Sequence, residues 1–161
     1  MSPAVLRGRA EVARRRTQLD AVFSRAASID VGDLQLRADF ARYLCILVAG
    51  HVEQSVQELA QQWCRRKSAE SVARYASTRL GNLRNVKSGK LCELVGSFDA
   101  TWEARLREKF ADELDALDGL MNLRNQIAHG VSVGTSLADA QRYFQNITAV
   151  LDHLNDVFDP V

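Results

Sequence analysis

Apolar residues recur at three- and four-residue steps along most of this chain, a spacing that predicts amphipathic helices. Long helices are expected over residues 3–27, 34–67 and about 100–129, and a last one ends near residue 158. Within the second helix, residues 43–50 are apolar all round, which is typical of a helix packed on more than one side. We therefore expect that helix at the centre of a bundle or at a dimer interface.

Shorter elements separate the long helices. Ser68 is a suitable N-cap for a helix over residues 69–80. A polar and basic connection follows over residues 82–90. Residues 91–95 then predict a short helical turn that breaks at Gly96.

Caps and prolines complete the fold prediction. Asp99 is placed to cap the third long helix, and Ser136 begins the spacing of a capping box for the last one. The two prolines, Pro3 and Pro160, lie at the ends, so no proline interrupts a helix between them. The chain is predicted to be all-α, a single domain over residues 1–161 in which long up-and-down helices carry short accessory helices.

Composition narrows the class of protein. Three cysteines without close spacing (Cys45, Cys64 and Cys92) indicate reduced thiols rather than a disulfide or zinc framework. No hydrophobic stretch follows the N-terminal arginines, so a secretory signal is not expected. The longest apolar run, residues 43–50, is too short to span a bilayer. A cytoplasmic protein without a membrane partner is the prediction.

Charge is distributed unevenly although the net charge is only +1. Residues 1–90 contain 16 Lys and Arg against 8 Asp and Glu, whereas residues 91–161 contain 5 against 12. The two halves could attract each other within the fold or across a dimer. Alternatively, the basic half presents a surface to a phosphate backbone.

Arg124 occupies an unexpected place in the third long helix. At about 100° per residue it falls in the middle of the apolar stripe, beyond Leu117 and Leu120. A guanidinium stays charged at any working pH, and burying an unpaired charge is costly. Arg124 therefore meets an anion there, or that end of the helix opens onto a cleft or a second subunit. His129, which can titrate near neutral pH, follows just before Gly130.

The string of residues 123–130, LRNQIAHG, resembles the R-x4-H signature of HEPN domains, in which a polar residue follows the arginine. HEPN domains are small all-helical proteins that dimerise and often cut RNA without a metal. The order of a long central helix, a basic loop, the motif late in the chain and one more helix also matches. Among HEPN proteins, the chain is most similar to the RiboL-PSP and MAE types.

The resemblance implies a homodimeric, metal-independent endoribonuclease that needs no cofactor. Arg124 would hold the phosphate, His129 would transfer protons, and Asn125 would hold the imidazole or a phosphate oxygen. Two copies of the set would meet in a dimer, and the products would be a 2′,3′-cyclic phosphate and a 5′-hydroxyl. A toxin or defence effector that acts on RNA and is restrained by a cognate antitoxin or other regulatory protein is the expected biological setting.

Further candidates are assigned by position. Glu53 on the second helix is the candidate acidic residue of the site, with a solvated or salt-bridged glutamate as the alternative. Lys87 and Lys90 in the basic loop are candidate RNA-binding residues, unless the loop is merely solvated. His51 is expected to pack in the core and His153 to lie at the surface.

Other interpretations remain open for the motif. Arg124 could pair with an acid on a neighbouring helix, and His129 could simply be favoured by the helix dipole. The alternative for the whole protein is a non-catalytic HEPN module that binds RNA, a nucleotide or a partner protein; a purely structural helical dimer is a third possibility. HEPN toxins paired with a nucleotidyltransferase antitoxin have a modified tyrosine two residues after the motif histidine. Val131 stands there, so regulation by AMPylation at that position is not expected.

Overall fold

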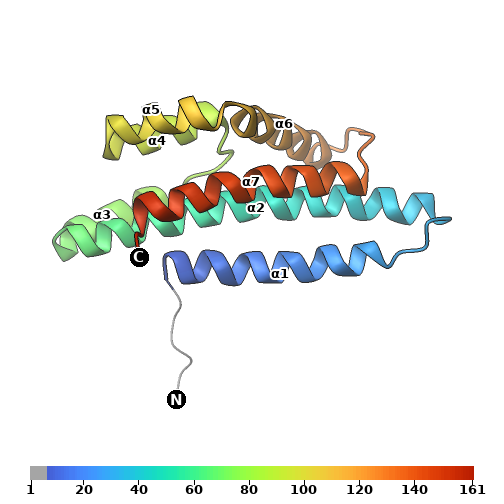
Figure 1. Cartoon of the computed structure of the whole chain (residues 1–161), viewed down its shortest axis with the longest axis horizontal. Coiled ribbons are helices and arrows are strands. Elements are labelled where there is room, and N and C mark those ends of the chain that lie inside the picture. Colours follow the sequence, from blue (N-terminus) through green and yellow to red (C-terminus); the bar gives the residue numbers. More distant parts are fainter. Residues whose placement is uncertain (1–6) are drawn as a thin grey trace, which may run out of the picture.

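The computed structural model describes residues 7–161, and these form seven α-helices and no strand. The prediction of an all-α bundle is confirmed. Figure 1 shows α2 and α7 side by side through the middle of the molecule, with α1 along one side of this pair and α4, α5 and α6 along the other. In chain order the helices are α1 (Arg9–Ala27), α2 (Leu34–Lys67), α3 (Glu70–Leu80), α4 (Ser88–Phe98), α5 (Ala100–Lys109), α6 (Ala111–Ala128) and α7 (Leu137–Phe158).

The α2–α7 pair forms the centre of the hydrophobic core. Leu44, Val48 and Leu59 of α2 and Leu151 and Leu154 of α7 are almost completely buried. Burying each such side chain stabilises the fold by about 1.5–3 kcal/mol. Only one face of residues 43–50 is buried, through Leu44, Cys45, Val48 and Ala49, whereas Tyr43 and Ile46 are 48% and 40% exposed. This apolar run is therefore not packed on all sides within the chain, although α2 has the bounds that its pattern predicts.

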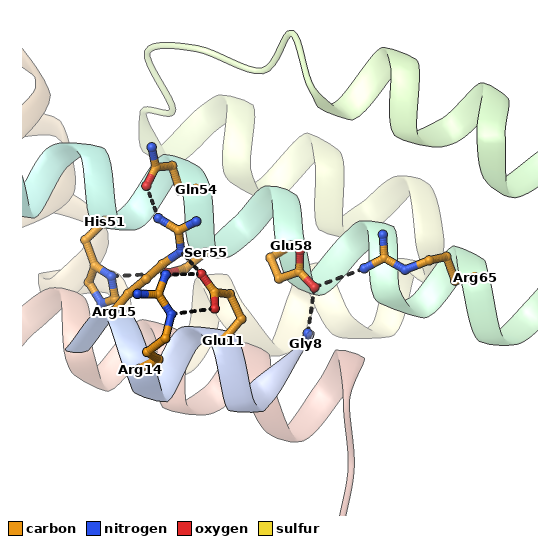
Figure 2. Close-up of polar contacts among 9 residues, drawn as sticks. All are labelled: Gly8, Glu11, Arg14, Arg15, His51, Gln54, Ser55, Glu58 and Arg65. Carbon is orange, nitrogen blue, oxygen red and sulfur yellow. Dashed lines mark hydrogen bonds and ion pairs between the residues drawn. The ribbon is translucent and has the colours of Figure 1, made fainter. Parts of the chain in front are cut away.

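Polar contacts hold the start of α1 against α2, as Figure 2 shows. The Glu58 carboxylate accepts hydrogen bonds from the Gly8 amide at 2.7 Å and from Arg65 Nη2 at 2.9 Å. Gly8 has a left-handed backbone (φ 56°), and a Cβ at this position would clash with Asp159 Oδ2. The predicted helix start at residue 3 lies outside the described residues, and within them α1 begins at Arg9.

His51 packs between α1, α2 and α7, as its sequence context predicts. Its side chain is buried, its Nδ1 lies 3.3 Å from Ser55 Oγ, and its ring meets Phe144 edge-on. Burial lowers the pKa of His51 to about 4, and the nearby charges of Arg15 and Arg16 act in the same direction. His51 is therefore neutral in the folded protein at neutral pH.

The prediction of one continuous helix over residues 100–129 is wrong. The backbone of Phe110 is non-helical (φ −125°, ψ 31°), and it ends α5 and begins α6. Leu106 and Leu114, on the two sides of this break, both point into the core, so the apolar spacing continues although the helix does not. Phe110 itself packs against the ring of His153, with the ring centroids 4.8 Å apart.

Three smaller expectations also need correction. α4 begins at Ser88 and continues through Gly96 to Phe98; the glycine is explained by the Glu103 side chain of α5, which occupies the space that a Cβ would fill. Ser68 ends α2 instead of capping α3, since its hydroxyl donates to the Cys64 carbonyl at 2.7 Å. His153 is half-buried beside Phe110 rather than free at the surface, and burial lowers its pKa.

The cysteines are buried thiols. Cys45, Cys64 and Cys92 form no disulfide, and burial raises the pKa of each, that of Cys45 to about 11. None of the helices described over residues 7–161 is both long and apolar enough to span a bilayer.

Candidate active site

Arg124 lies on α6 and pairs with Glu53 of α2. Its Nη2 donates to Glu53 Oε1 at 2.9 Å and lies 3.9 Å from the sulfur of Met121. The Glu53 side chain is 9% exposed and that of Arg124 is 23% exposed, so most of each side chain is shielded from solvent. The apolar position of Arg124 is therefore tolerated because the guanidinium meets an internal carboxylate, which is the ion-pair alternative raised by the sequence.

Asn85 connects this ion pair to the following motif residue. The Asn85 amide donates to the same Oε1 atom of Glu53 at 2.8 Å, and the Asn85 side-chain oxygen accepts from Asn125 Nδ2 at 3.1 Å. Asn85 has a left-handed backbone (φ 53°), a conformation that asparagine adopts more readily than most residues. The loop between α3 and α4 thus joins Glu53, Arg124 and Asn125 into one hydrogen-bonded cluster.

The basic loop ends before Ser88, not at residue 90 as predicted, so Lys87 is the N-cap of α4 and Lys90 lies in the first turn of that helix. Lys90 Nζ donates to the Arg84 carbonyl at 2.6 Å and so fastens the loop, while the Lys87 amide donates to the Asn85 carbonyl at 2.9 Å. Next to them, Ser88 donates from its amide and its hydroxyl to Asp118 of α6, each at 2.7 Å. These contacts fix the loop beside α6, and neither lysine is bonded to the Arg124–Glu53 pair.

His129 is exposed at the C-terminal end of α6. Gly130 has a left-handed backbone (φ 71°), its amide donates to the Ile127 carbonyl, and the Val131 amide donates to the Gln126 carbonyl at 2.9 Å. This is the Schellman arrangement that ends many helices, and it explains the glycine after the histidine.

Helix geometry places the three motif residues on two faces of α6. Asn125 and His129 are four residues apart and share a face. Arg124 precedes His129 by five residues, so the two Cα atoms are separated by about 7.5 Å along the axis and about 140° around it. Within one chain, Asn125 therefore lies between the Arg124–Glu53 pair and the exposed imidazole.

No group of three or more His, Cys, Asp or Glu side chains within residues 7–161 is arranged to hold a metal ion. Four hollows of about 420–670 Å³ are lined by residues outside the motif, over α1, α2, α3, α5 and α7. None of these four hollows is lined by Arg124, Asn125 or His129.

One known protein family accounts for nearly the whole chain. The family model described as HEPN_RiboL-PSP, RiboL-PSP-HEPN, matches residues 10–159. This chain belongs to the RiboL-PSP-HEPN family. The match extends from the first turn of α1 to the residue after α7, and the resemblance to HEPN proteins inferred from the sequence is confirmed. No curated protein and no solved structure matches it significantly.

Two features of this RiboL-PSP-HEPN protein escape sequence reasoning. Asn85, whose amide and side chain join Glu53 to Asn125, carries no motif, although a lone asparagine in a polar loop is a signal for a left-handed turn. The bonds from Ser88 to Asp118 join residues 30 positions apart, and no local pattern indicates them.

Proposed function

We propose that this protein is a metal-independent endoribonuclease that acts as a homodimer through Arg124, Asn125 and His129. The observation that supports this proposal most directly is the cluster of Glu53, Arg124, Asn85 and Asn125 beside an exposed histidine in a RiboL-PSP-HEPN fold. The family points to a nuclease or another RNA-related role. The residue types supply what RNA cleavage without a metal requires.

Each residue has a role in the proposed reaction. His129 removes the proton from the 2′-hydroxyl, which attacks the adjacent phosphorus, and a second imidazole gives a proton to the departing 5′ oxygen. Arg124 stabilises the charge that builds up on the phosphate. Asn125 orients the imidazole or a phosphate oxygen through its amide. Glu53 is a positioning residue, since it holds Arg124 and the Asn85 loop together.

The need for two imidazoles favours a dimer. One chain contributes a single His129, and helix geometry turns that residue about 140° away from Arg124. A symmetric pair of chains would bring a second histidine and a second arginine to the same phosphate.

The decisive experiment incubates the purified protein with RNA in EDTA and identifies the ends that are formed. Wild type should produce 2′,3′-cyclic phosphate and 5′-hydroxyl ends, and Arg124→Ala and His129→Ala should each reduce cleavage by about 100-fold or more. Arg107→Ala, which removes an exposed arginine of α5, is the matched control and should cleave normally. Full cleavage by either motif variant would refute the assignment.

One observation favours a second candidate function. Because Arg124 is engaged by Glu53 and mostly covered, the same face could serve as a non-catalytic surface for RNA, a nucleotide or a partner protein. This alternative predicts RNA binding that weakens with salt and no cyclic-phosphate ends. The cleavage assay therefore separates the two functions.

The biological role proposed is that of a toxin or defence effector in the cytoplasm, held inactive by an antitoxin or another regulatory protein. Induced expression should arrest growth, and His129→Ala should relieve the arrest at an equal protein level. Equal toxicity of the two proteins would separate growth arrest from RNA cleavage.

A further inference from the structure

Tyr75 stands exposed on the outer face of α3. The opposite face of the helix packs on α2 through Ala73 and Leu80, which are buried. Tyr75 is 62% exposed and Val72, one turn before it, is 54% exposed. The tyrosine ring therefore does not pack in the core. The reason for an aromatic residue at this position has to be sought among its neighbours on the surface.

One arginine stacks on this ring, and a second lines the hollow beside it. The guanidinium of Arg79 lies over the Tyr75 ring, 5.2 Å from its centroid, and Arg74 lies next to Tyr75 in the sequence. An open hollow of about 670 Å³ on the same face is lined by Glu70, Ser71, Arg74, Tyr75 and Thr78. An aromatic ring stacked with an arginine offers flat surfaces to a nucleobase, and positive charge beside it attracts phosphate.

The charge of this segment favours a polyanion. Residues 70–90 contain five basic side chains and a single acidic one, Glu70, which lies in the first turn of α3 and pairs with Arg74 at 3.5 Å. Both partners of that pair are more than 80% exposed, so water screens the pair strongly. The basic side chains are Arg74, Arg79, Arg84, Lys87 and Lys90.

The same segment leads directly to the motif cluster. α3 ends at Leu80, and the following loop contains Arg84, whose Nη1 donates to the Gly81 carbonyl at 3.0 Å. The next residue, Asn85, bonds to Glu53 and Asn125. The Cα atoms of Tyr75 and Asn85 are at most about 25 Å apart, because five helical steps and five fully extended steps separate them along the chain. Figure 1 shows this loop passing from the end of α3 toward α4.

We propose that Arg74, Tyr75 and Arg79 form a binding surface for single-stranded RNA, the α3 surface, which delivers the strand to the cluster around Arg124. The occupant follows from the proposed ribonuclease function and from the charge of the segment. A single strand is required, because a base can stack on Tyr75 only when its face is not covered by neighbouring base pairs. The α3 surface thus makes the cleavage selective for unpaired RNA.

Binding can be measured without cleavage. A fluorescent single-stranded RNA with 2′-O-methyl groups lacks the attacking hydroxyl, so its anisotropy reports affinity whether or not the protein is a nuclease. Tyr75→Ala should weaken binding roughly tenfold, and Tyr75→Phe should keep the wild-type affinity because the ring remains. Tyr43→Ala, at another exposed tyrosine on α2, is the matched control and should bind normally.

The arginine and the strand selectivity provide independent readouts. Arg79→Ala should reduce the slope of log affinity against log salt by about 0.7, as expected for one lost phosphate contact on a single strand. A blunt duplex of the same sequence should bind more weakly than the single strand, and Tyr75→Ala should not weaken duplex binding further. In the cleavage assay Tyr75→Ala should raise KM for single-stranded RNA.

The outcomes separate this inference from the proposed function. Normal binding by Tyr75→Ala, equal binding of duplex and single strand, or no binding by wild type would overturn the α3 surface. If the Tyr75→Ala variant differs from wild type in oligomeric mass but not in RNA affinity, the α3 surface is also overturned. The ring would then belong to a contact between proteins. Tyr75-dependent binding without cleavage by wild type would support the α3 surface and refute the ribonuclease.

Discussion

The side chains of Arg124 and Glu53, 71 residues apart in sequence, join α6 to α2 by a 2.9 Å ion pair, and the Asn85 amide is hydrogen-bonded to the same carboxylate. Glu53 Oε1 accepts both the guanidinium N–H and the Asn85 amide. The carboxylate therefore pairs with a mostly covered charge through Nη2, while Arg124 Nε is buried without a hydrogen-bond partner, and it fixes the loop that touches Asn125. Glu53 Oε1 therefore contributes both to the stability of the fold and to the positioning of the proposed catalytic residues.

Replacing the carboxylate should affect both properties. Glu53→Gln should lower the free energy of unfolding by about 1–3 kcal/mol, since it leaves the half-buried guanidinium without a counter-charge, and should reduce cleavage at least tenfold. Urea denaturation and the RNA assay measure the two effects. The control is Glu58→Gln, at another glutamate of α2, which weakens the contacts to Gly8 and Arg65 (Figure 2). This variant should lose stability but keep cleavage. Normal activity in Glu53→Gln would show that Glu53 has a structural role only.

The Asn85 side chain can be removed without straining its backbone. Asn85→Gly keeps the left-handed conformation but loses the acceptor for Asn125 Nδ2, so we expect a change in unfolding free energy within about 1 kcal/mol and a roughly tenfold loss of cleavage. Asn82→Gly, in the same loop, is the control and should cleave normally. An equal loss in both variants would point to general loosening of the loop.

A dimer that uses two imidazoles can be tested with mixed chains. Co-expression with two different tags yields a heterodimer in which one chain is wild type and the other carries His129→Ala. If acid and base come from two chains, its cleavage should fall about 100-fold, because one of the two proton transfers is lost. A heterodimer with Arg107→Ala in place of His129→Ala should remain fully active. Retention of half the wild-type rate would instead indicate two independent sites.

Acid should destabilise the fold through His51. Since burial depresses its pKa to about 4, the unfolded chain takes up a proton below about pH 6.5 that the folded protein does not bind, and stability is lost as the pH falls from 6.5 toward 4. Between pH 7 and pH 4.5 wild type should lose roughly 2 kcal/mol more than His51→Gln, which cannot titrate. His153 contributes in the same direction in both proteins and cancels from the comparison. Parallel urea titrations at the two pH values measure the difference, and equal losses would contradict it.

The capping box of α7 is expected to stabilise the helix that completes the core. Ser136 Oγ accepts from the Asp139 amide at 3.0 Å, and the Asp139 carboxylate accepts from the Ser136 amide at 3.1 Å. Ser136→Ala should therefore lower the unfolding free energy by about 1 kcal/mol. Ser24→Ala, at an exposed position of α1, should change it by less than about 0.5 kcal/mol. Thermal or urea unfolding of the two variants tests the difference.

Local sequence signals predicted those parts of the fold that local physics decides. The apolar pattern of residues 34–67 and the Ser136 capping box gave the bounds of α2 and the start of α7. The break at Phe110 was missed because Leu106 and Leu114 keep the same apolar spacing on both sides of it. Gly96 was misread because the close approach of Glu103, which explains the glycine, belongs to a neighbouring helix.

The candidate site likewise combines features that the local sequence reveals with contacts that depend on how the helices pack. Arg124 stands out in sequence because its charge interrupts an apolar stripe, and the position of Glu53 on the central helix suggested it as a site residue. That the two bond to each other depends on how α2 packs against α6, which no local pattern contains. Asn85 was missed for the same reason, since its partners lie 32 and 40 residues away. The catalytic roles of these residues remain predictions for the RNA assay.

The hydrogen bond from the Asn85 amide to Glu53 also provides a reporter within the molecule. Asn85 and the preceding Arg84 are exposed residues of a turn outside any helix, where backbone amide protons ordinarily exchange rapidly with deuterium from the solvent. Its own proton is held by a carboxylate that is almost completely buried, so it should be retained far longer than those of its neighbours. The deuterium uptake of this one position would reveal, in the unmodified protein, when a bound RNA or regulator releases Glu53.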